Sequence, residues 1–492
     1  MIEEGISLDA IFRRNAQRWP DAPALIDPPN RAQFTHGAPR RLTYSETEHA
    51  VARLAAILQS LGLPAHEPVA MQLPNTVEAV IALLAVLRAG LVAAPLPLLW
   101  RRVDGAAAIS QIGACAIITC GRVGDADHGA AALQMAADAF SVRYVCGFGG
   151  NLPDGIVALD EIFSGPATPA SGRVDETGAD AVAAITFDTA TGAAAVRGHT
   201  ALLVGGLTTV LEAELPRHAR LLNTILPSSF AALATSVIPW LLTGGTLTLH
   251  HPFDGEVLSR QMGEGADGLI VPGPVASRIT RDLSHSDTKR IALWRDPQRL
   301  GGEMLSDGEA TVDVQAFGEA GIVASRRNSD GTPGRFVVGP RRAPNGKTDA
   351  PVVMQLGRTT SGTLALDGPM LPLPLSDATA DHAASGGALQ DTGYPCRVDP
   401  LTGALTVTGA PAGQVHVGGY CFLMPVLQEQ IARVAENGTL AALPDPLAGQ
   451  KLAGAVSDPA AMRHALSVLG LNPLVARAFR DPRRATLASP AQ

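Results

Sequence analysis

The chain has 492 residues, of which 46% are hydrophobic, and its formal net charge is -8 at pH 7. This length and composition predict a globular protein with a large core, built as one large or several ordinary domains. Acidic and basic residues are interspersed along the sequence without a long basic run. We therefore expect neither a nucleic acid nor an anionic membrane as the main partner.

Five cysteines are spread along the sequence without a Cys-x-x-Cys pair or histidines at metal-ligand spacing: Cys115, Cys120, Cys146, Cys396 and Cys421. We expect them to be small buried residues in a reducing compartment. The first residues lack the basic and apolar regions of a signal peptide. The most apolar run, residues 79–99, is interrupted by Arg88, Gly90, Pro95 and Pro97, so no membrane-spanning helix is expected. These features predict a cytoplasmic protein.

A strand, a buried helix and a second strand are predicted within the first hundred residues. Residues 69–73 are strand-like, and Asn75 precedes Glu78 by three residues, which is the spacing of a capping box at a helix start. The apolar run that follows continues the helix, and Gly90 ends it. Residues 91–94 form the next strand. This order predicts a parallel unit with a right-handed crossover.

The same alternation is repeated further along the chain. Residues 115–119 are strand-like, residues 130–139 form an Ala-rich helical segment, and residues 142–145 are the next strand. We therefore expect an α/β fold in which helices cover the sheets.

Domain boundaries are predicted in the last quarter of the chain. The Gly- and Pro-containing stretch 409–413 separates a large domain, residues 1–409, from a small domain of strands and helices, residues 410–479. Residues 480–492 are expected to form a disordered tail. The polar stretch 378–387 is expected to be a mobile loop.

Residues 186–200 have the frame of a phosphate-binding loop but lack its usual glycines and lysine. The stretch resembles the loop of the adenylate-forming (AMP-forming) acyl-CoA ligase superfamily. That loop reads aromatic-Thr-Ser-Gly-Thr-Thr-Gly-x-Pro-Lys-Gly-Val, with His-Thr-His shortly after it in some members. Thr191, Gly192, His199 and Thr200 match this pattern. The resemblance implies that Thr191 and Gly192 contact the nucleotide.

Further segments resemble the same superfamily in the same order, so the likeness extends from about residue 8 to residue 456. Each match is short, and their order carries the resemblance. It implies a large N-terminal domain of helix-covered sheets and a small, mobile α+β C-terminal domain. The segments are residues 19–25, 41–46, 69–97, 226–230, 242–246, 271–272, 301–305, 317–321, 392–399 and 445–450.

The resemblance implies a reaction in which a carboxylate attacks the α-phosphate of ATP and a thiol then displaces AMP from the acyl-adenylate. Concentrated negative charge makes cations and Mg²⁺ the largest catalytic contributions. The family's loop lysine falls on Ala195, its magnesium-binding glutamate on Gly321, its ribose-binding aspartate on Tyr394 and a following arginine on Ala410. Its C-terminal lysine is missing too, because the last lysine in the chain is Lys451. Losing these groups together predicts little adenylation.

Neighbouring residues offer substitutes for the lost groups. Arg197 is two residues from Ala195 and could reach a phosphate as a bidentate fork. Glu319 could offer a carboxylate to Mg²⁺, and Phe317 could stack on adenine. His199 stands where some family members have a loop histidine. The alternatives are a solvated surface charge for Arg197 and Glu319 and a structural histidine for His199.

Other matches fall in the last quarter of the chain. Arg397 and Asp399 keep the family's Arg-x-Asp spacing. Gly418 and Gly419 resemble the glycine turn by which the small domain contacts the thiol substrate, and the alternative is a plain hairpin turn.

Three functions are compatible with the sequence. The first, which we favour, is a catalytically degenerate homologue that binds an acyl group, a carrier or a partner protein. The second is an active acyl- or aryl-CoA ligase that uses ATP, Mg²⁺ and CoA or a carrier thiol, with a nucleotide site rebuilt around Arg197 and Glu319. The third is an acyl transferase acting on a preformed thioester, which would need a nucleophile that the sequence does not identify.

Overall fold

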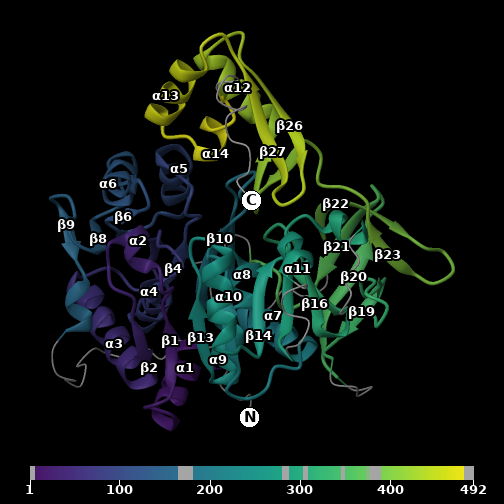
Figure 1. The fold of residues 1–492 in the computed structure, drawn as a ribbon, viewed down its shortest axis with the longest axis horizontal. Helices are drawn as coiled ribbons and strands as arrows, with labels where there is room; N and C mark the ends of the chain where they lie inside the picture. Colours follow the sequence, from purple (N-terminus) through teal and green to yellow (C-terminus); the bar gives the residue numbers. More distant parts are fainter. Residues whose placement is uncertain are drawn as a thin grey trace.

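The computed structural model describes residues 6–164, 181–279, 287–302, 308–344, 350–373, 375 and 389–480. Within these residues a large unit, residues 6–407, is followed by a small unit, residues 414–479, which lies above the large one in Figure 1. Residues 378–387 and 481–492, for which a mobile loop and a tail are predicted, lie outside the described residues.

A seven-stranded sheet forms the N-terminal part of the large unit. The predicted strand-helix-strand units are confirmed, because β3, β4, β5 and β8 pair in parallel. All residues of β5 are buried, as expected for a parallel strand with both faces covered. In spatial order the strands are β11 (Ala194–Gly198), β10 (Val182–Phe187), β4 (Val92–Pro95), β3 (Pro68–Met71), β5 (Ala116–Cys120), β8 (Tyr144–Phe148) and β9 (Ile156–Ala158).

An eight-stranded sheet forms the middle of the large unit. Its strands are parallel except at the two edges, where β2 and β17 pair antiparallel with their neighbours. In spatial order they are β17 (Gly321–Arg326), β16 (Thr311–Phe317), β15 (Lys289–Trp294), β14 (Gly268–Pro272), β12 (Arg220–Asn223), β13 (Thr246–Leu249), β1 (Pro23–Ile26) and β2 (Arg41–Thr43).

The remaining large sheets are antiparallel. Six strands close the large unit, and four more belong to the small unit. The six are β18 (Phe336–Val337), β23 (Ala404–Val407), β22 (Gln390–Val398), β21 (Thr363–Asp367), β20 (Val352–Arg358) and β19 (Gly339–Arg342). The four are β25 (Tyr420–Leu423), β24 (Gln414–Val417), β27 (Gly449–Ala455) and β26 (Thr439–Asp445).

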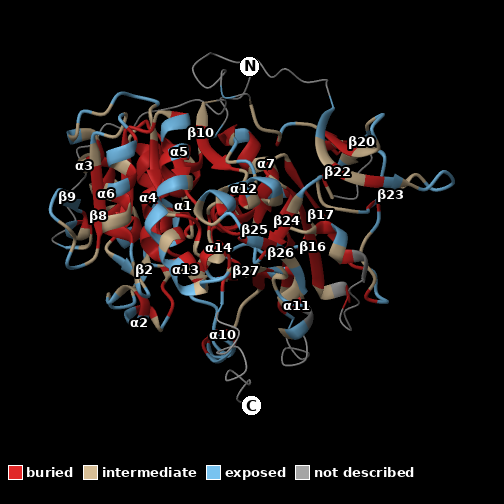
Figure 2. Ribbon diagram, turned by 90° about the horizontal axis from the view of Figure 1, so that it is seen from above, coloured by how far each residue is buried: buried red, intermediate tan, exposed pale blue. Residues whose placement is uncertain are grey.

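Helices cover the sheets, so the predicted fold class is confirmed. Figure 2 shows that buried residues concentrate along the strands and on the helix faces that meet them. None of the described helices combines the length and apolar character needed to cross a membrane. The helices of the large unit are α1 (Leu8–Arg18), α2 (Arg31–Thr35), α3 (Tyr44–Ser60), α4 (Val77–Arg88), α5 (Arg102–Ile112), α6 (His128–Asp138), α7 (His199–Glu212), α8 (Phe230–Thr235), α9 (Val237–Thr243), α10 (Gly255–Gly263) and α11 (Gly273–Ile279).

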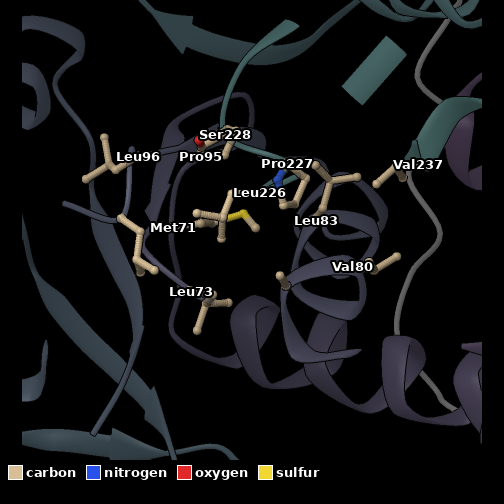
Figure 3. Close-up of a pocket in the computed structure, with 12 residues that line it drawn as sticks. Met71, Leu73, Val80, Leu83, Pro95, Leu96, Leu226, Pro227, Ser228 and Val237 are labelled. Atoms are coloured by element: carbon tan, nitrogen blue, oxygen red, sulfur yellow. The ribbon is translucent and has the colours of Figure 1, made fainter. Parts of the chain in front are cut away.

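The core of the large unit is tightly filled. A cavity of about 20 Å³ remains beside α4, and Figure 3 shows it enclosed by apolar side chains such as Met71, Leu83 and Leu226. We call this space the small cavity.

The five cysteines are free and buried, as expected from the sequence.

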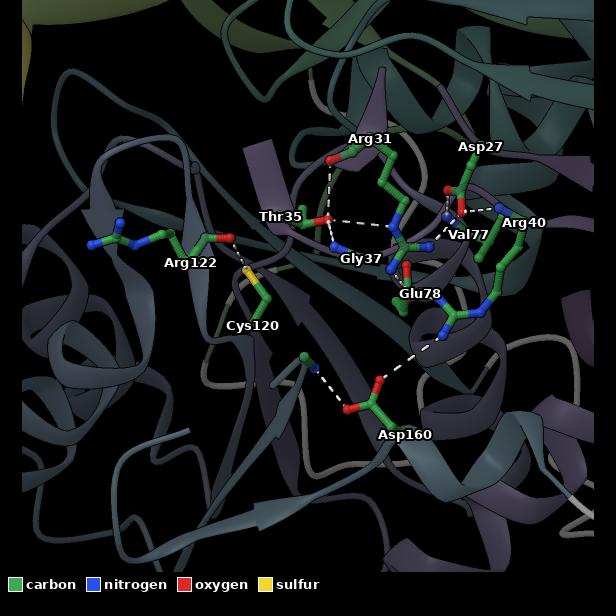
Figure 4. Close-up of polar contacts among 11 residues, drawn as sticks. Asp27, Arg31, Thr35, Gly37, Arg40, Val77, Glu78, Cys120, Arg122 and Asp160 are labelled. Atoms are coloured by element: carbon green, nitrogen blue, oxygen red, sulfur yellow. Dashed lines mark hydrogen bonds and ion pairs between the residues drawn. The ribbon is translucent and has the colours of Figure 1, made fainter. Parts of the chain in front are cut away.

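The start of α4 differs from the predicted capping box. Thr76 is the N-cap residue, and its side chain makes no capping hydrogen bond. Instead the Asp27 carboxylate accepts a hydrogen bond from the Val77 N–H at 2.9 Å. Asn75 and Glu78, the predicted capping pair, contact other segments of the chain instead. Asn75 donates to the backbone oxygens of two residues in other segments, and Glu78 accepts from Arg31 and Arg40 at 2.5 Å each (Figure 4).

The small unit has a hydrophobic cluster of its own, formed by its sheet and its helices. The helices are α12 (Met424–Val434), α13 (Pro459–Leu469) and α14 (Pro473–Ala476). The boundary predicted at residues 409–413 lies between the last strand of the large unit and the first strand of the small one. The division of the chain at residue 409 stays a prediction.

Candidate functional site between the two units

A cavity of about 400 Å³ lies between the large and the small unit. We call it the interunit cavity. This volume falls within the range of small-molecule sites. The large unit supplies an apolar wall, which includes Leu226, Phe253, Leu293 and Trp294. The small unit closes the space with residues of its own sheet, so the shape of the cavity depends on both units.

Polar groups of the large unit gather where β15 ends. Arg295, Asp296 and Arg299 follow that strand and line the cavity. The Arg295 guanidinium donates a hydrogen bond to Ser229 Oγ at 2.7 Å, and Arg299 donates to the Pro446 carbonyl of the small unit at 3.0 Å. The carboxyl ends of parallel strands are common positions for ligand-binding groups.

The glycine turn of the small unit closes the other side. Gly418 and Gly419 join β24 to β25 with φ values of 56 and 87°, a backbone that favours glycine at both positions. The next residue, Tyr420, accepts a hydrogen bond from the Leu99 N–H of the large unit at 2.9 Å. The predicted turn is therefore a two-residue hairpin whose tip contacts the large unit and lines the cavity.

The interunit cavity and the small cavity share Leu226 and Ser228 as lining residues. The small cavity has an almost entirely apolar lining, and its position next to these shared residues places it behind the wall of the larger one.

The loop between β10 and β11 binds its own backbone donors. Asp188 Oδ1 accepts hydrogen bonds from the Ala190 and Thr191 N–H groups at 3.0 and 2.9 Å, and from Thr191 Oγ1 at 3.0 Å. Thr191 Oγ1 accepts from the Ala193 N–H, and the Gly192 N–H donates to the Asp188 carbonyl. The N–H groups that a phosphate-binding loop directs at its ligand are thus used within the loop.

Arg197, in β11, and Glu319 form a buried pair that also contacts Thr186 of β10. Their side chains are 1% and 8% exposed, and Arg197 Nη1 lies 3.7 Å from Glu319 Oε2. Arg197 also donates to the backbone oxygens of Met370, at 3.0 Å, and of Glu319, and its guanidinium lies over the Phe230 ring. Burial lowers the pKa of Arg197 to about 10, while the nearby carboxylate opposes that shift. The pair is neither solvated nor open, so the alternative of a surface charge is wrong for both residues.

The Glu319 carboxylate has two further partners. Oε2 accepts hydrogen bonds from Thr186 Oγ1 at 2.5 Å and from the Phe230 N–H at 3.0 Å. Burial raises the pKa of Glu319, and Arg197 opposes this rise. In the described part of the chain, no group of three or more His, Cys, Asp or Glu side chains is placed to hold a metal ion.

Comparison with known proteins now adds family membership to this geometry. The family model described as "AMP-binding enzyme" matches residues 12–265, more than half of the chain. The chain belongs to the AMP-binding enzyme family.

A curated relative of this AMP-binding enzyme is the salicyl-AMP ligase / salicyl-S-ArCP synthetase of Mycobacterium tuberculosis, which is 40% identical over 86 residues. The alignment covers 18% of this chain and 14% of the relative. The chain therefore spans only a small part of that relative's length in the comparison, and the relative's activity is a matter for proposal.

Solved structures show the same fold over nearly the whole chain. The amide bond synthetase McbA of Marinactinospora thermotolerans has a TM-score of 0.67 and 18% identity, and the match covers 96% of this chain and 94% of that one. NpsA-ThdA, an artificially fused adenylation-PCP di-domain of Klebsiella oxytoca, has a TM-score of 0.64 and 17% identity, with 98% and 94% covered. At this identity the likeness shows the fold alone.

The sequence resemblance places charged residues of the family on Gly321 and Tyr394 of this chain. A Cβ atom built on Gly321 would meet Leu366 Cδ1 and Met354 Cε at 3.3 Å each, so the surroundings of this position do not suit Mg²⁺. Tyr394 is 2% exposed, and its ring packs edge-on against Phe317 with centroids 5.4 Å apart. Burial raises the pKa of Tyr394 well above its ordinary value. Phe317 is itself buried by this contact.

The other predicted site residues are dispersed. His199 begins α7, and its Nδ1 accepts a hydrogen bond from the Leu8 N–H of α1 at 3.2 Å. Burial lowers its pKa to about 4, so the ring is neutral near pH 7. Arg397 and Asp399 are exposed at the end of β22, and Asp399 accepts hydrogen bonds from the N–H groups of a turn there. Of the predicted residues, only Gly418 and Gly419 line the interunit cavity.

Several residues of the candidate site were not singled out in the sequence. Asp188 could have been recognised from the Asp-x-x-Thr spacing of a turn. Arg295 and Asp296 could have been recognised because they follow an apolar, strand-like run. His416, which lines the cavity, stands in a strand just before the glycine turn.

Proposed function

We propose that this AMP-binding family member binds an acyl group in the interunit cavity and does not activate carboxylates with ATP. The observation that carries the proposal is the loop after β10, in which the Asp188 carboxylate occupies the backbone N–H groups. An anionic side chain at this position competes with a phosphate for the same donors and repels it.

The surrounding charges support the same proposal. Adenylation concentrates negative charge on phosphorus and pyrophosphate, so it depends on preorganised cations and on a metal ion. Gly321 and Tyr394 supply neither a metal ligand nor a ribose acceptor, and the site residues present do not fit Mg²⁺. We therefore derive no catalytic step through ATP or Mg²⁺.

The alternative of a rebuilt nucleotide site around Arg197 and Glu319 would require a large rearrangement. Each side chain is the other's buried partner, and Glu319 also accepts from the Phe230 N–H. Moving either one toward a nucleotide would leave a buried charge and a backbone donor without partners, which is costly.

Acyl binding is supported by the lining of the interunit cavity. Its wall is mostly apolar, while Arg295 and Arg299 offer cationic groups at one side. Such a site suits a small carboxylic acid or the acyl end of a thioester. A carrier-bound acyl group is a further candidate, because a similarly folded adenylation domain is joined to a carrier in the fused Klebsiella protein. We propose that the protein is cytoplasmic, which cell fractionation would test.

The nucleotide part of the proposal is tested by pyrophosphate exchange. The protein is incubated with ATP, Mg²⁺ and a panel of aliphatic and aromatic carboxylic acids. We expect no exchange and no rise in melting temperature with ATP, because a nucleotide that does not bind cannot stabilise the fold. Any exchange would overturn the proposal, and its loss in an Arg197→Ala variant shown to be folded would favour the rebuilt site.

The acyl part is tested by binding without chemistry. S-benzyl-N-acetylcysteamine is a thioether with a methylene in place of the thioester carbonyl, so it can bind but cannot transfer an acyl group. We expect it to raise the melting temperature of the wild-type protein, and we expect Trp294→Ala, which changes the apolar wall, to reduce that rise. An equal shift in both proteins would contradict binding at this cavity.

A further inference from the structure

A cysteine and a histidine face each other beside the interunit cavity. His416 in β24 and Cys421 in β25 are directly opposite in the register of the hairpin, and Cys421 Sγ lies 3.5 Å from His416 Nδ1. Their strand neighbours Val415 and Phe422 belong to the core cluster of the small unit. Because side chains alternate along a strand, His416 and Cys421 point to the opposite face, toward the large unit.

Groups of the large unit complete the arrangement. The Cys421 N–H donates to Thr189 Oγ1 at 2.8 Å, and the Arg295 backbone opposes the fall in the pKa of the His416 ring. Asp296 contributes a carboxylate near the same ring, and its Oδ1 atom is buried without a hydrogen-bond partner among the described residues. The thiol and the imidazole are thus paired as a nucleophile and its base, and the Asp296 carboxylate, which lines the same cavity, opposes the fall in the pKa of His416.

The groups that surround Cys421 line the interunit cavity. His416, Thr189, Tyr420 and Asp296 line it, whereas Cys421 does not line it and contacts Thr189 and His416. No role has been assigned to this thiol so far. The cavity provides the apolar region that an acyl chain or aromatic ring would occupy.

We propose that Cys421 accepts an acyl group from a small acyl thioester, with His416 as the general base. This rests on the proposed acyl-binding function of the cavity and gives it a covalent step. The Cys421 sulfur forms a bond to the thioester carbonyl carbon, and the bond from that carbon to the original sulfur breaks. The proton moves from Cys421 Sγ to His416 Nδ1 and then to the departing thiolate. One thioester is exchanged for another, without oxidation or reduction.

Before the reaction, the Cys421 thiol and the His416 imidazole are both uncharged. Burial raises the pKa of Cys421 to about 12, and Asp188 adds to this rise, so the thiol keeps its proton. Burial lowers the pKa of His416, which leaves the imidazole neutral and able to accept that proton. The proton then moves as the sulfur attacks, as in a serine–histidine pair. Cys421 is expected to react slowly with iodoacetamide, since that reagent requires a thiolate.

The experiment uses the full chain without ATP. The protein is incubated with S-benzoyl- or S-octanoyl-N-acetylcysteamine, and acyl adducts are located by peptide mass spectrometry. We expect an adduct at Cys421, and the other buried cysteines of the same molecule serve as internal controls. Cys421→Ser should abolish it, while Cys146→Ser, a matched change at a buried cysteine of β8, should leave it unchanged.

His416 is tested as the base by His416→Asn. This variant should form the adduct at least about a hundredfold more slowly, because general-base catalysis contributes about 10²- to 10⁴-fold. Circular dichroism and binding of S-benzyl-N-acetylcysteamine show whether the variant is folded and still binds. Binding of the thioether without an adduct at Cys421 would overturn this proposal and leave acyl binding intact, whereas absence of both would overturn the two together. An adduct rate that His416→Asn does not change would also overturn it.

Discussion

The contacts of Arg197 give a structural role to a residue that the sequence offers as a phosphate ligand. In sequence it is the cation nearest to the missing loop lysine. In the fold its guanidinium is enclosed by the carboxylate of Glu319, backbone oxygens and the Phe230 ring. A sequence cannot tell these outcomes apart, because the partner carboxylate lies 122 residues away along the chain.

Arg197→Met should destabilise the protein by about 3–5 kcal/mol, because it leaves the Glu319 carboxylate buried without its cation. Chemical denaturation measures the change. Adding Glu319→Gln to the same chain should recover part of the loss, since the amide still accepts a hydrogen bond but carries no charge. Arg397→Met, a change at an exposed arginine, should alter stability by less than about 0.5 kcal/mol. Equal effects of the two arginine substitutions would contradict a structural role for Arg197.

His199 should make stability depend on pH. Its folded pKa of about 4 is below the ordinary value of 6.5, so between these values the unfolded chain binds more protons than the folded one. Its contribution is therefore complete above about pH 6.5 and is lost as the pH falls toward 4. The loss is at most about 1.4 kcal/mol for each pH unit in that window.

The pH dependence of His199 is isolated by His199→Asn, whose side-chain oxygen can still accept from the Leu8 N–H but does not titrate in this range. Urea unfolding of both proteins at pH 7.5 and pH 5 gives the comparison. The wild type should lose more stability than the variant on acidification. Parallel losses would mean that His199 does not stay neutral in the fold.

At the level of elements, the packing of α7 depends on two adjacent glycines. A Cβ atom built on Gly206 would lie 2.2 Å from Ile238 Cγ2 of α9, and one built on Gly205 would lie 2.7 Å from the Phe230 ring of α8. Glycine weakens an isolated helix, so its use here reflects close approach of the neighbouring helices.

Gly206→Ala should destabilise the protein by about 1–3 kcal/mol, because the added methyl group overpacks the contact with α9 by more than the gain in helix propensity. Gly263→Ala is the matched control, since nothing lies within 4 Å of a Cβ atom at that helical position in α10. The control should be neutral or stabilising in the same thermal unfolding experiment. A stable Gly206→Ala variant would show that the helices can separate without cost.

Most elements of the N-terminal sheet could be predicted from the sequence, because apolar runs and glycine stops are local signals. The start of α4 could not, since its cap is the carboxylate of Asp27, fifty residues earlier in the chain. The candidate site could be predicted even less well. Arg295 and His416 lie in separate units and meet only after folding, although the pairing of His416 with Cys421 follows from a two-residue Gly-Gly turn.

For the whole molecule, few direct hydrogen bonds link the described parts of the two units, and one of them is made by Tyr420. Its hydroxyl accepts from the Leu99 N–H, and burial raises its pKa to about 12, so it stays protonated. The backbone of α5 adds another link, because the Val103 N–H donates to the Gly470 carbonyl at 3.1 Å.

Tyr420→Phe should favour separation of the units, because the Leu99 N–H would lose its partner at a cost of about 1–3 kcal/mol. Limited proteolysis at residues 408–413 should become roughly 5- to 150-fold faster, which corresponds to that free energy. Tyr144→Phe in β8 is the matched control and should leave the cleavage rate unchanged. Equal rates for all three proteins would show that this hydrogen bond does not hold the units together.

The interunit cavity has one wall on each unit, so a molecule that fills it contacts both units and holds them together. Thermodynamic linkage then requires that a ligand bound there stabilises the arrangement in which the units are in contact. Conversely, a change that separates the units weakens binding of that ligand. The occupancy of the cavity and the distance between the two units therefore report the same equilibrium. A probe of interunit distance would serve as a sensor for ligands whose identity is still unknown.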